Sequence, residues 1–166
     1  GLATLPYASK GWTVFAFEPV RLNMYVLKAN TRKYSHVYTF HAAVSDKLKT
    51  ADIFVPKGQE DNSAVGGATV ADLNVQTGKV THEKVEFVTL DNSLLNHPDF
   101  VIDNVRVIKI DTQGHEINVL KGMRRLSKML PMNAKIIVEN DDKLQRAAGR
   151  SSVELVAVIR DLGFEC

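Results

Sequence analysis

Short apolar runs alternate with stretches of helical periodicity along this chain of 166 residues. The runs are brief and rich in branched and aromatic residues, as buried strands are. They cover residues 12–17, 36–43, 51–56, 80–90, 105–110 and 135–138. Apolar residues at helical spacing occupy residues 2–10, 19–30, 91–97, 115–129 and 151–162. Strands that alternate with helices predict an α/β fold, with a mostly parallel sheet and helices on both of its faces.

The middle of the chain departs from this alternation. Residues 57–79 contain repeated Gly and Asn and predict a long loop, in which Asn62 is a minor candidate for ligand binding. The whole segment 51–90 lacks long helical periodicity. We therefore expect it to add strands at the edge of the sheet.

Composition narrows the possible partners. Hydrophobic residues make up 45% and charged residues 24%, which is ordinary for a globular domain, and the length suits a single domain over residues 1–166. A net charge of +2 gives no reason to expect nucleic acid. No run approaches the ~18 apolar residues of a membrane span. The one cysteine, Cys166, and five histidines without paired spacing give no reason to expect a metal site.

The first candidate for chemistry is Glu18. It follows the strand-like run Trp12–Phe17 and precedes Pro19. Open α/β sheets bind ligands at the carboxyl ends of their strands, and an acid there accepts hydrogen bonds from both hydroxyls of a ribose. A competing interpretation is that Glu18 caps the helix that begins at Pro19, because acids favour helix N-termini. One carboxylate can do both.

A second acidic segment follows the run Val105–Ile110, with the sequence Asp111-Thr112-Gln113-Gly114-His115-Glu116. Four further blocks occur around it in a fixed order. The five blocks are Phe15–Pro19, Phe40–Asp46, Val88–Asp91, Val105–Glu116 and Ile136–Glu139. Together they resemble the FkbM family of S-adenosylmethionine-dependent methyltransferases over nearly the whole chain.

The resemblance implies a Rossmann-like three-layer sandwich of the class I methyltransferase type, with S-adenosylmethionine as cofactor. Family members carry a strand and a glycine-rich turn upstream, and of that turn only Gly1 would be present here. They also end in a strand hairpin beyond Cys166. We therefore expect a truncated domain without its first strand. Trp12–Phe17 and Val105–Ile110 should then be internal, parallel strands on either side of a vacant position, and the fragment itself should be inactive.

The resemblance also implies that the loop after the third strand lies against the adenine of the cofactor. Ala43, Ser45 and Asp46 occupy that loop. A backbone N–H or a short polar side chain there can reach the base. The competing interpretation is an ordinary turn after a strand, since Ser and Asp are common turn residues.

Asp111 is the leading candidate for catalysis, because in the family's fold it faces both methyl donor and acceptor. A carboxylate there can orient a hydroxyl and accept its proton, and the competing interpretation is that Asp111 caps the helix before His115. Lys109 interrupts an apolar strand two residues earlier and shares a face with Asp111. It is a further catalytic candidate, or else only the partner that a buried charge needs. Glu139 ends another strand and is expected to position the acceptor. We expect His115 to be an exposed residue at a helix start and Glu116 to be structural, in the first turn.

The resemblance leaves the acceptor open. The leading hypothesis is O-methylation of a hydroxyl on a sugar or another small molecule. One alternative is a nicotinamide- or nucleotide-binding Rossmann domain, because an acid after the second strand suits the ribose of NAD equally well. The other is a non-catalytic methyltransferase-like module that keeps the sheet for interactions only.

Overall fold

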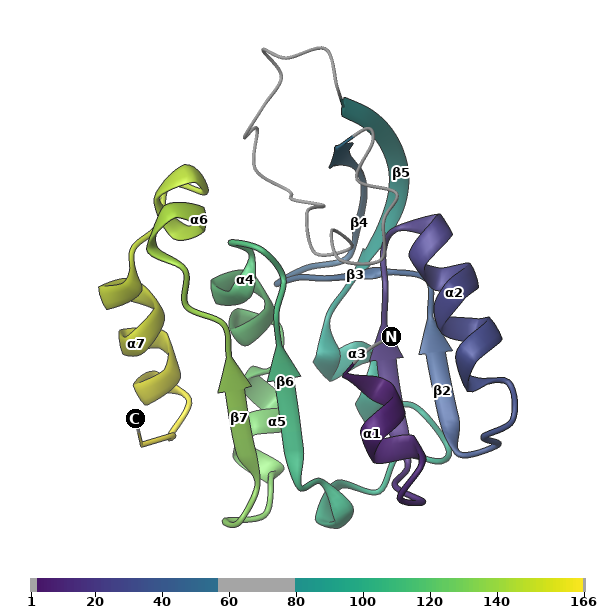
Figure 1. The fold of residues 1–166 in the computed structure, drawn as a ribbon. Coiled ribbons are helices and arrows are strands. Elements are labelled where there is room, and N and C mark those ends of the chain that lie inside the picture. The colour runs from purple at the N-terminus through teal and green to yellow at the C-terminus, as the bar shows by residue number, and fades with distance from the viewer. Residues whose placement is uncertain (1–2, 57–79, 166) are drawn as a thin grey trace.

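The computed structural model describes residues 3–56 and 80–165, as helices around short sheets (Figure 1). The candidate residues Gly1 and Asn62 and the predicted loop at 57–79 lie outside the described residues. Strands β1, β2, β6 and β7 all point the same way in Figure 1. Their carboxyl ends therefore lie at one side of the molecule.

Two parallel pairs form this row of strands. β1 (Val14–Phe17) pairs with β2 (Val37–Phe40), and β6 (Val107–Ile110) pairs with β7 (Lys135–Val138). β1 and β6 belong to separate sheets, so they are not hydrogen-bonded neighbours, as expected. Each has a single ladder partner among the described strands, so the expectation that both are internal is not met there.

A third sheet is mixed. β3 (Ala43–Val44) runs parallel to β5 (Val80–Val88), which pairs antiparallel with β4 (Lys49–Pro56). The predicted run at 36–43 is thus split into β2 and β3. The β4–β5 ladder is the longest in the described chain and is antiparallel, whereas the other three pairings are parallel, so a mostly parallel sheet is not established. The alternation of buried and exposed residues along β5 suits its antiparallel pairing. Val85 and Phe87 are buried while Lys84 and Glu86 are exposed, as in an antiparallel sheet with one covered face.

Helices occupy the connections between the strands. They are α1 (Thr4–Ala8), α2 (Arg21–Thr31), α3 (Leu90–Leu95), α4 (Glu116–Lys121), α5 (Arg124–Met129), α6 (Asp142–Ala147), α7 (Ser152–Asp161) and a 3₁₀ turn, η2 (Ile102–Asn104). In α3, α6 and α7 the N-cap residue's own side chain caps the helix, namely Thr89, Asp141 and Ser151. The α6 helix was not predicted, although Asp141 is a typical N-cap.

The predicted helix at 115–129 is broken into α4 and α5 at Gly122. A Cβ atom at Gly122 would lie 2.0 Å from the carbonyl oxygen of Ser45, so only glycine allows this approach. The Asp91 carboxylate then accepts hydrogen bonds from the N–H groups of Arg125 and Leu126, at 3.0 and 2.7 Å. Asp91 thereby caps α5. The apolar residues keep their helical spacing through 115–129, so the sequence did not predict this break.

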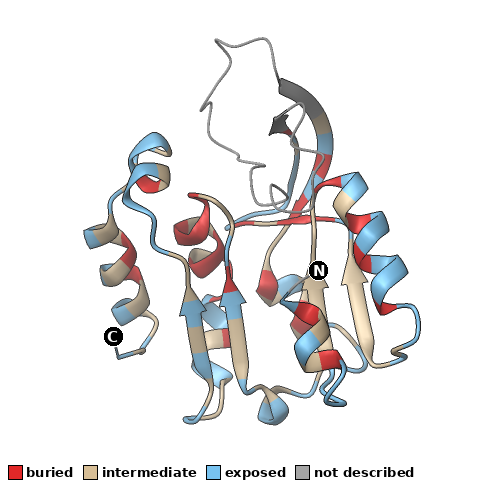
Figure 2. Cartoon of the chain, viewed as in Figure 1, coloured by how far each residue is buried: buried red, intermediate tan, exposed pale blue. Residues whose placement is uncertain are grey.

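The core lies on one side of β6 and β7. Ile108, Ile110, Ile136 and Val138 pack against a cluster of buried residues from α3, α4, α5 and α7. The opposite face carries Lys109 and Ile137, and Ile137 is 49% exposed (Figure 2). Helices therefore cover only one face of this pair in the described chain, so a three-layer sandwich is not established.

Candidate active site at the carboxyl ends of the strands

Glu18 lies directly after β1, at the carboxyl end of the parallel pair. Its N–H donates to the carbonyl oxygen of Phe40 at 3.0 Å, which fixes its backbone. Its Oε1 accepts from the N–H of Val20 at 3.0 Å and from Asn23 Nδ2 at 3.4 Å, so it caps the start of α2. Both bonds use Oε1, which leaves Oε2 to accept from a ligand. Burial raises the pKa of Glu18 above its usual value, against the lowering effect of these bonds.

Strand β3 and the loop after it hold three further predicted cofactor residues. Ala43 is buried and packs with Val20 and Phe87, so its side chain belongs to the core. Ser45 is fully buried, and its N–H donates to the carbonyl oxygen of Val88 at 2.7 Å. Asp46 alone presents its side chain to solvent. Partial burial acts to raise the pKa of Asp46, but the hydrogen bond from Ser45 helps to hold it below its usual value.

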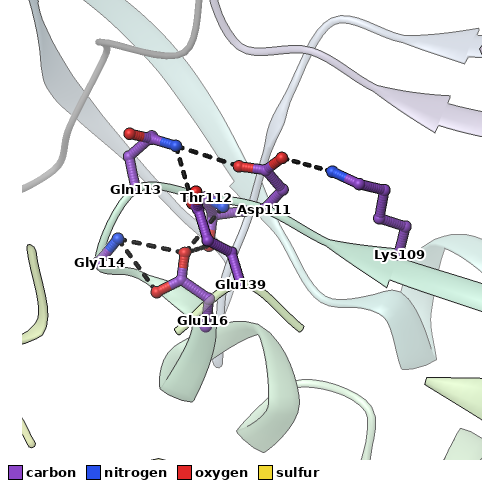
Figure 3. A network of polar contacts seen from close by, with 7 residues as sticks. All are labelled: Lys109, Asp111, Thr112, Gln113, Gly114, Glu116 and Glu139. Atoms are coloured by element: carbon purple, nitrogen blue, oxygen red, sulfur yellow. Dashed lines mark hydrogen bonds and ion pairs between the residues drawn. The ribbon is translucent and has the colours of Figure 1, made fainter. Parts of the chain in front are cut away.

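Lys109 and Asp111 form an ion pair at the end of β6, as their spacing predicted (Figure 3). Lys109 is not buried: its side chain is 42% exposed and that of Asp111 39%. The reason is that no described helix covers this face of β6 and β7. An exposed pair contributes little to stability, so its value lies in where it holds the Asp111 carboxylate.

Gln113 joins Asp111 to Glu139. Its Nε2 donates to Asp111 Oδ1 at 3.0 Å and to Glu139 Oε2 at 2.8 Å (Figure 3). The β6–β7 ladder continues through a bond of 2.9 Å from the N–H of Glu139 to the carbonyl oxygen of Ile110, which brings this acid beside Asp111. Gln113 has a φ of 54°, a left-handed conformation that is uncommon outside glycine. Sequence analysis missed Gln113, and its only signal was its place in a turn before Gly114.

The buried carboxylate of Glu116 stabilises this turn by accepting hydrogen bonds. It is 1% exposed and accepts from the Thr112 N–H at 2.8 Å, from Gly114 N–H at 3.0 Å and from Gln145 Nε2 at 2.6 Å. Gly114 is needed because its φ is +96° and a Cβ there would lie 2.8 Å from the carbonyl oxygen of Leu144. The carboxylate of Glu116 thus replaces the hydrogen bonds that the turn cannot make internally, which agrees with its expected structural role.

His115 is not the exposed residue that its place at a helix start suggested. It is 9% exposed, with its ring edge toward Phe87 and its Nε2 3.0 Å from Ser45 Oγ. Burial, followed by the positive charge of Lys49, lowers the pKa of His115 to about 4. The ring is therefore neutral at physiological pH. It links the turn that carries Asp111 and Gln113 to the loop that carries Asp46.

The two site carboxylates have pKa values that are pushed apart. Burial raises the pKa of Glu139 to about 7, assisted by its hydrogen bond with Asp111 and the negative charge of Asp111. Partial burial also acts to raise the pKa of Asp111, but its hydrogen bonds with Lys109, Glu139 and Gln113 outweigh this and hold it below the usual value. Near neutral pH, Asp111 is ionised while Glu139 exchanges its proton. Such a pair suits acid–base chemistry.

The raised pKa of Glu139 predicts a pH-dependent stability. The folded state holds the Glu139 proton more tightly than the unfolded state, so this contribution is complete below the ordinary pKa of 4.5 and is lost as pH rises to about 7. Glu139→Gln should abolish this part of the pH dependence, and the surface substitution Glu154→Gln should keep it. Urea denaturation at pH 4.5 and pH 7 measures both. An unchanged pH dependence in Glu139→Gln would contradict the assignment.

Neither a metal centre nor a membrane span emerges from the described chain. Across residues 3–56 and 80–165, no three His, Cys, Asp or Glu side chains gather closely enough to hold a metal ion. No helix in those ranges has the length and apolar character needed to cross a membrane.

Comparison with known proteins identifies the family of this chain. The family model described as the methyltransferase FkbM domain matches residues 2–166. No curated protein and no solved structure gives a significant match. The match spans both the loops after β1 and β3 and the acidic turn after β6. The chain is therefore a methyltransferase domain that belongs to the FkbM family.

Proposed function

We propose that this domain transfers a methyl group from S-adenosylmethionine to a hydroxyl of a small molecule such as a sugar. The observation that carries the proposal is that acids follow the carboxyl ends of strands in parallel pairs, with Glu18 after β1, Asp46 after β3, Asp111 after β6 and Glu139 after β7. We propose the class I three-layer architecture for the domain as a whole.

The donor set around Glu18 and Asp46 fits the nucleoside part of the cofactor. Glu18 Oε2 is the acceptor for the ribose hydroxyls, because Oε1 already caps α2. Asp46 is exposed, and Ser45 holds only its Oδ1. The other oxygen of Asp46 can accept from the amino group of adenine. When bound, S-adenosylmethionine supplies an electrophilic methyl group on a sulfonium.

The acidic turn would handle the acceptor. Both oxygens of Asp111 already accept hydrogen bonds, from Lys109 and from Gln113. Asp111 is therefore suited to orienting an acceptor hydroxyl. Glu139, with its pKa of about 7, is better suited to taking the hydroxyl proton. This exchanges the roles expected from the sequence, where Asp111 was the favoured base. Lys109 keeps Asp111 ionised and in place.

The cofactor side can be tested by calorimetric titration with S-adenosylmethionine. Glu18→Ala should weaken binding by ~1.5–3 kcal/mol, or ~10–150-fold, because hydrogen bonds to a charged group are lost. Glu83→Ala is the matched control, since Glu83 Oε2 accepts from the Arg21 N–H at 2.9 Å and so also caps α2.

The control separates ligand binding from helix capping. If Glu18→Ala and Glu83→Ala weaken binding equally, Glu18 acts only as a cap. If Glu18→Ala binds as tightly as the wild type, Glu18 is not the ribose ligand.

A further inference from the structure

A chain of hydrogen bonds runs from Arg150 to Asp46 through three side chains that the proposed function does not use. Arg150 NH2 lies 3.3 Å from Asn118 Oδ1, and Asn118 Nδ2 lies 3.0 Å from His115 Nδ1. His115 Nε2 lies 3.0 Å from Ser45 Oγ, which lies 3.0 Å from Asp46 Oδ1. The chain joins the segment before α7, helix α4 and the loop after β3, and it ends on a predicted cofactor residue.

The direction of the bonds follows from the acceptor end. The Asp46 carboxylate can only accept, so the Ser45 hydroxyl donates to it. The Ser45 oxygen then accepts a hydrogen bond from His115, which places the ring proton on Nε2. Asn118 turns Oδ1 toward Arg150 and Nδ2 toward the ring, where Nδ2 lies 3.0 Å from Nδ1 and 3.4 Å from Nε2 and therefore sits over the ring face.

Ser45, His115 and Asn118 are also residue types found together at nucleophilic sites. That interpretation fails here because Ser45 is fully buried and cannot meet a substrate. The hydroxyl also points away from the ring, toward Asp46, so His115 is not placed to remove its proton. The chain orients a carboxylate and does not activate a nucleophile.

We propose that His115 is a positioning residue, which acts through Ser45 to hold the Asp46 carboxylate in one orientation for the cofactor. The proposal rests on the proposed function, because Asp46 is assigned there to the adenine. With Oδ1 held by Ser45, the second oxygen is left for the ligand.

The test removes each of the two side chains that hold Asp46. His115→Phe keeps a flat ring but has no N–H, so the Ser45 hydroxyl is no longer held toward Asp46. Ser45→Ala removes the hydrogen bond to Asp46 directly. Ser127→Ala is the control, because Ser127 donates to the Arg124 carbonyl at 3.0 Å on the surface.

Two measurements need no cofactor. Nitrogen-15 NMR of the His115 ring should show the Nε2–H form in the wild type and in Ser127→Ala. Carboxyl NMR titration should show a higher pKa for Asp46 in Ser45→Ala and in His115→Phe than in the wild type, with no change in Ser127→Ala. A ring proton on Nδ1 in the wild type, or an unchanged Asp46 titration in both variants, would overturn the relay.

The third measurement is the affinity for S-adenosylmethionine by calorimetry. Ser45→Ala and His115→Phe should each weaken binding roughly 3- to 10-fold, and the double variant no more than either, since both act on one hydrogen bond. Unchanged affinity in both single variants would overturn the positioning role. A wild type that does not bind S-adenosylmethionine would defeat the proposed function, and the positioning role with it, while the NMR data still decide the direction of the relay.

Discussion

Glu139→Gln should lower the turnover of methyl transfer by ~100–10,000-fold, the usual contribution of a general base. The amide keeps the shape of the side chain but cannot take a proton. In the wild type the rate should rise with pH toward a plateau above about 7, since the free carboxylate is the active form. The variant should lack this rise. Transfer of a radiolabelled methyl group to a panel of monosaccharides and polyols measures it.

Asp111→Asn is the matched variant that separates the two carboxylates. If Asp111 orients the acceptor, KM should rise more than turnover falls, and the pH profile should survive. A large loss of turnover in Asp111→Asn with a mild effect in Glu139→Gln would restore Asp111 as the base. Wild-type turnover in both variants would remove this acidic turn from the reaction.

Glu116→Ala should destabilise the fold by ~3–5 kcal/mol, because several buried donors lose their acceptor at a cost of ~1–3 kcal/mol each. The donors of Thr112, Gly114 and Gln145 would lose their acceptor, and Gln145 is itself only 1% exposed. A buried donor without an acceptor carries its full desolvation cost. Urea denaturation with an unchanged m-value measures the loss.

Glu154→Ala is the control for this effect. Glu154 pairs with Arg150 at 2.9 Å and with Lys121 at 3.5 Å, but its side chain is 36% exposed. Such a pair is worth ~0–1 kcal/mol. If Glu116→Ala costs no more than Glu154→Ala, the turn after β6 is held by something other than this carboxylate.

Local patterns in the sequence predicted the strands and the contacts between near neighbours. The apolar runs located β1, β6 and β7, and a spacing of two residues predicted the pairing of Lys109 with Asp111. Both depend on short-range geometry, which periodicity encodes directly.

Such patterns could not predict contacts between segments that are far apart in the sequence. Gln113 reaches Glu139 across 26 residues, and Ser45 reaches His115 across 70 residues. The break at Gly122 arises because the Ser45 carbonyl packs against it. The exposure of Lys109 and the burial of His115 likewise depend on which faces become covered, and helical or strand spacing does not specify that.

The central claim is that S-adenosylmethionine binds at the carboxyl ends of β1 and β3. The most direct test is a titration of nitrogen-15-labelled protein with S-adenosylmethionine, and separately with NAD, followed through the backbone amide signals. The account predicts saturable shifts at Glu18, Ser45 and Asp46 with S-adenosylmethionine and no comparable shifts with NAD. Shifts at these residues with NAD alone, or S-adenosylmethionine shifts that leave these residues unchanged, would contradict it.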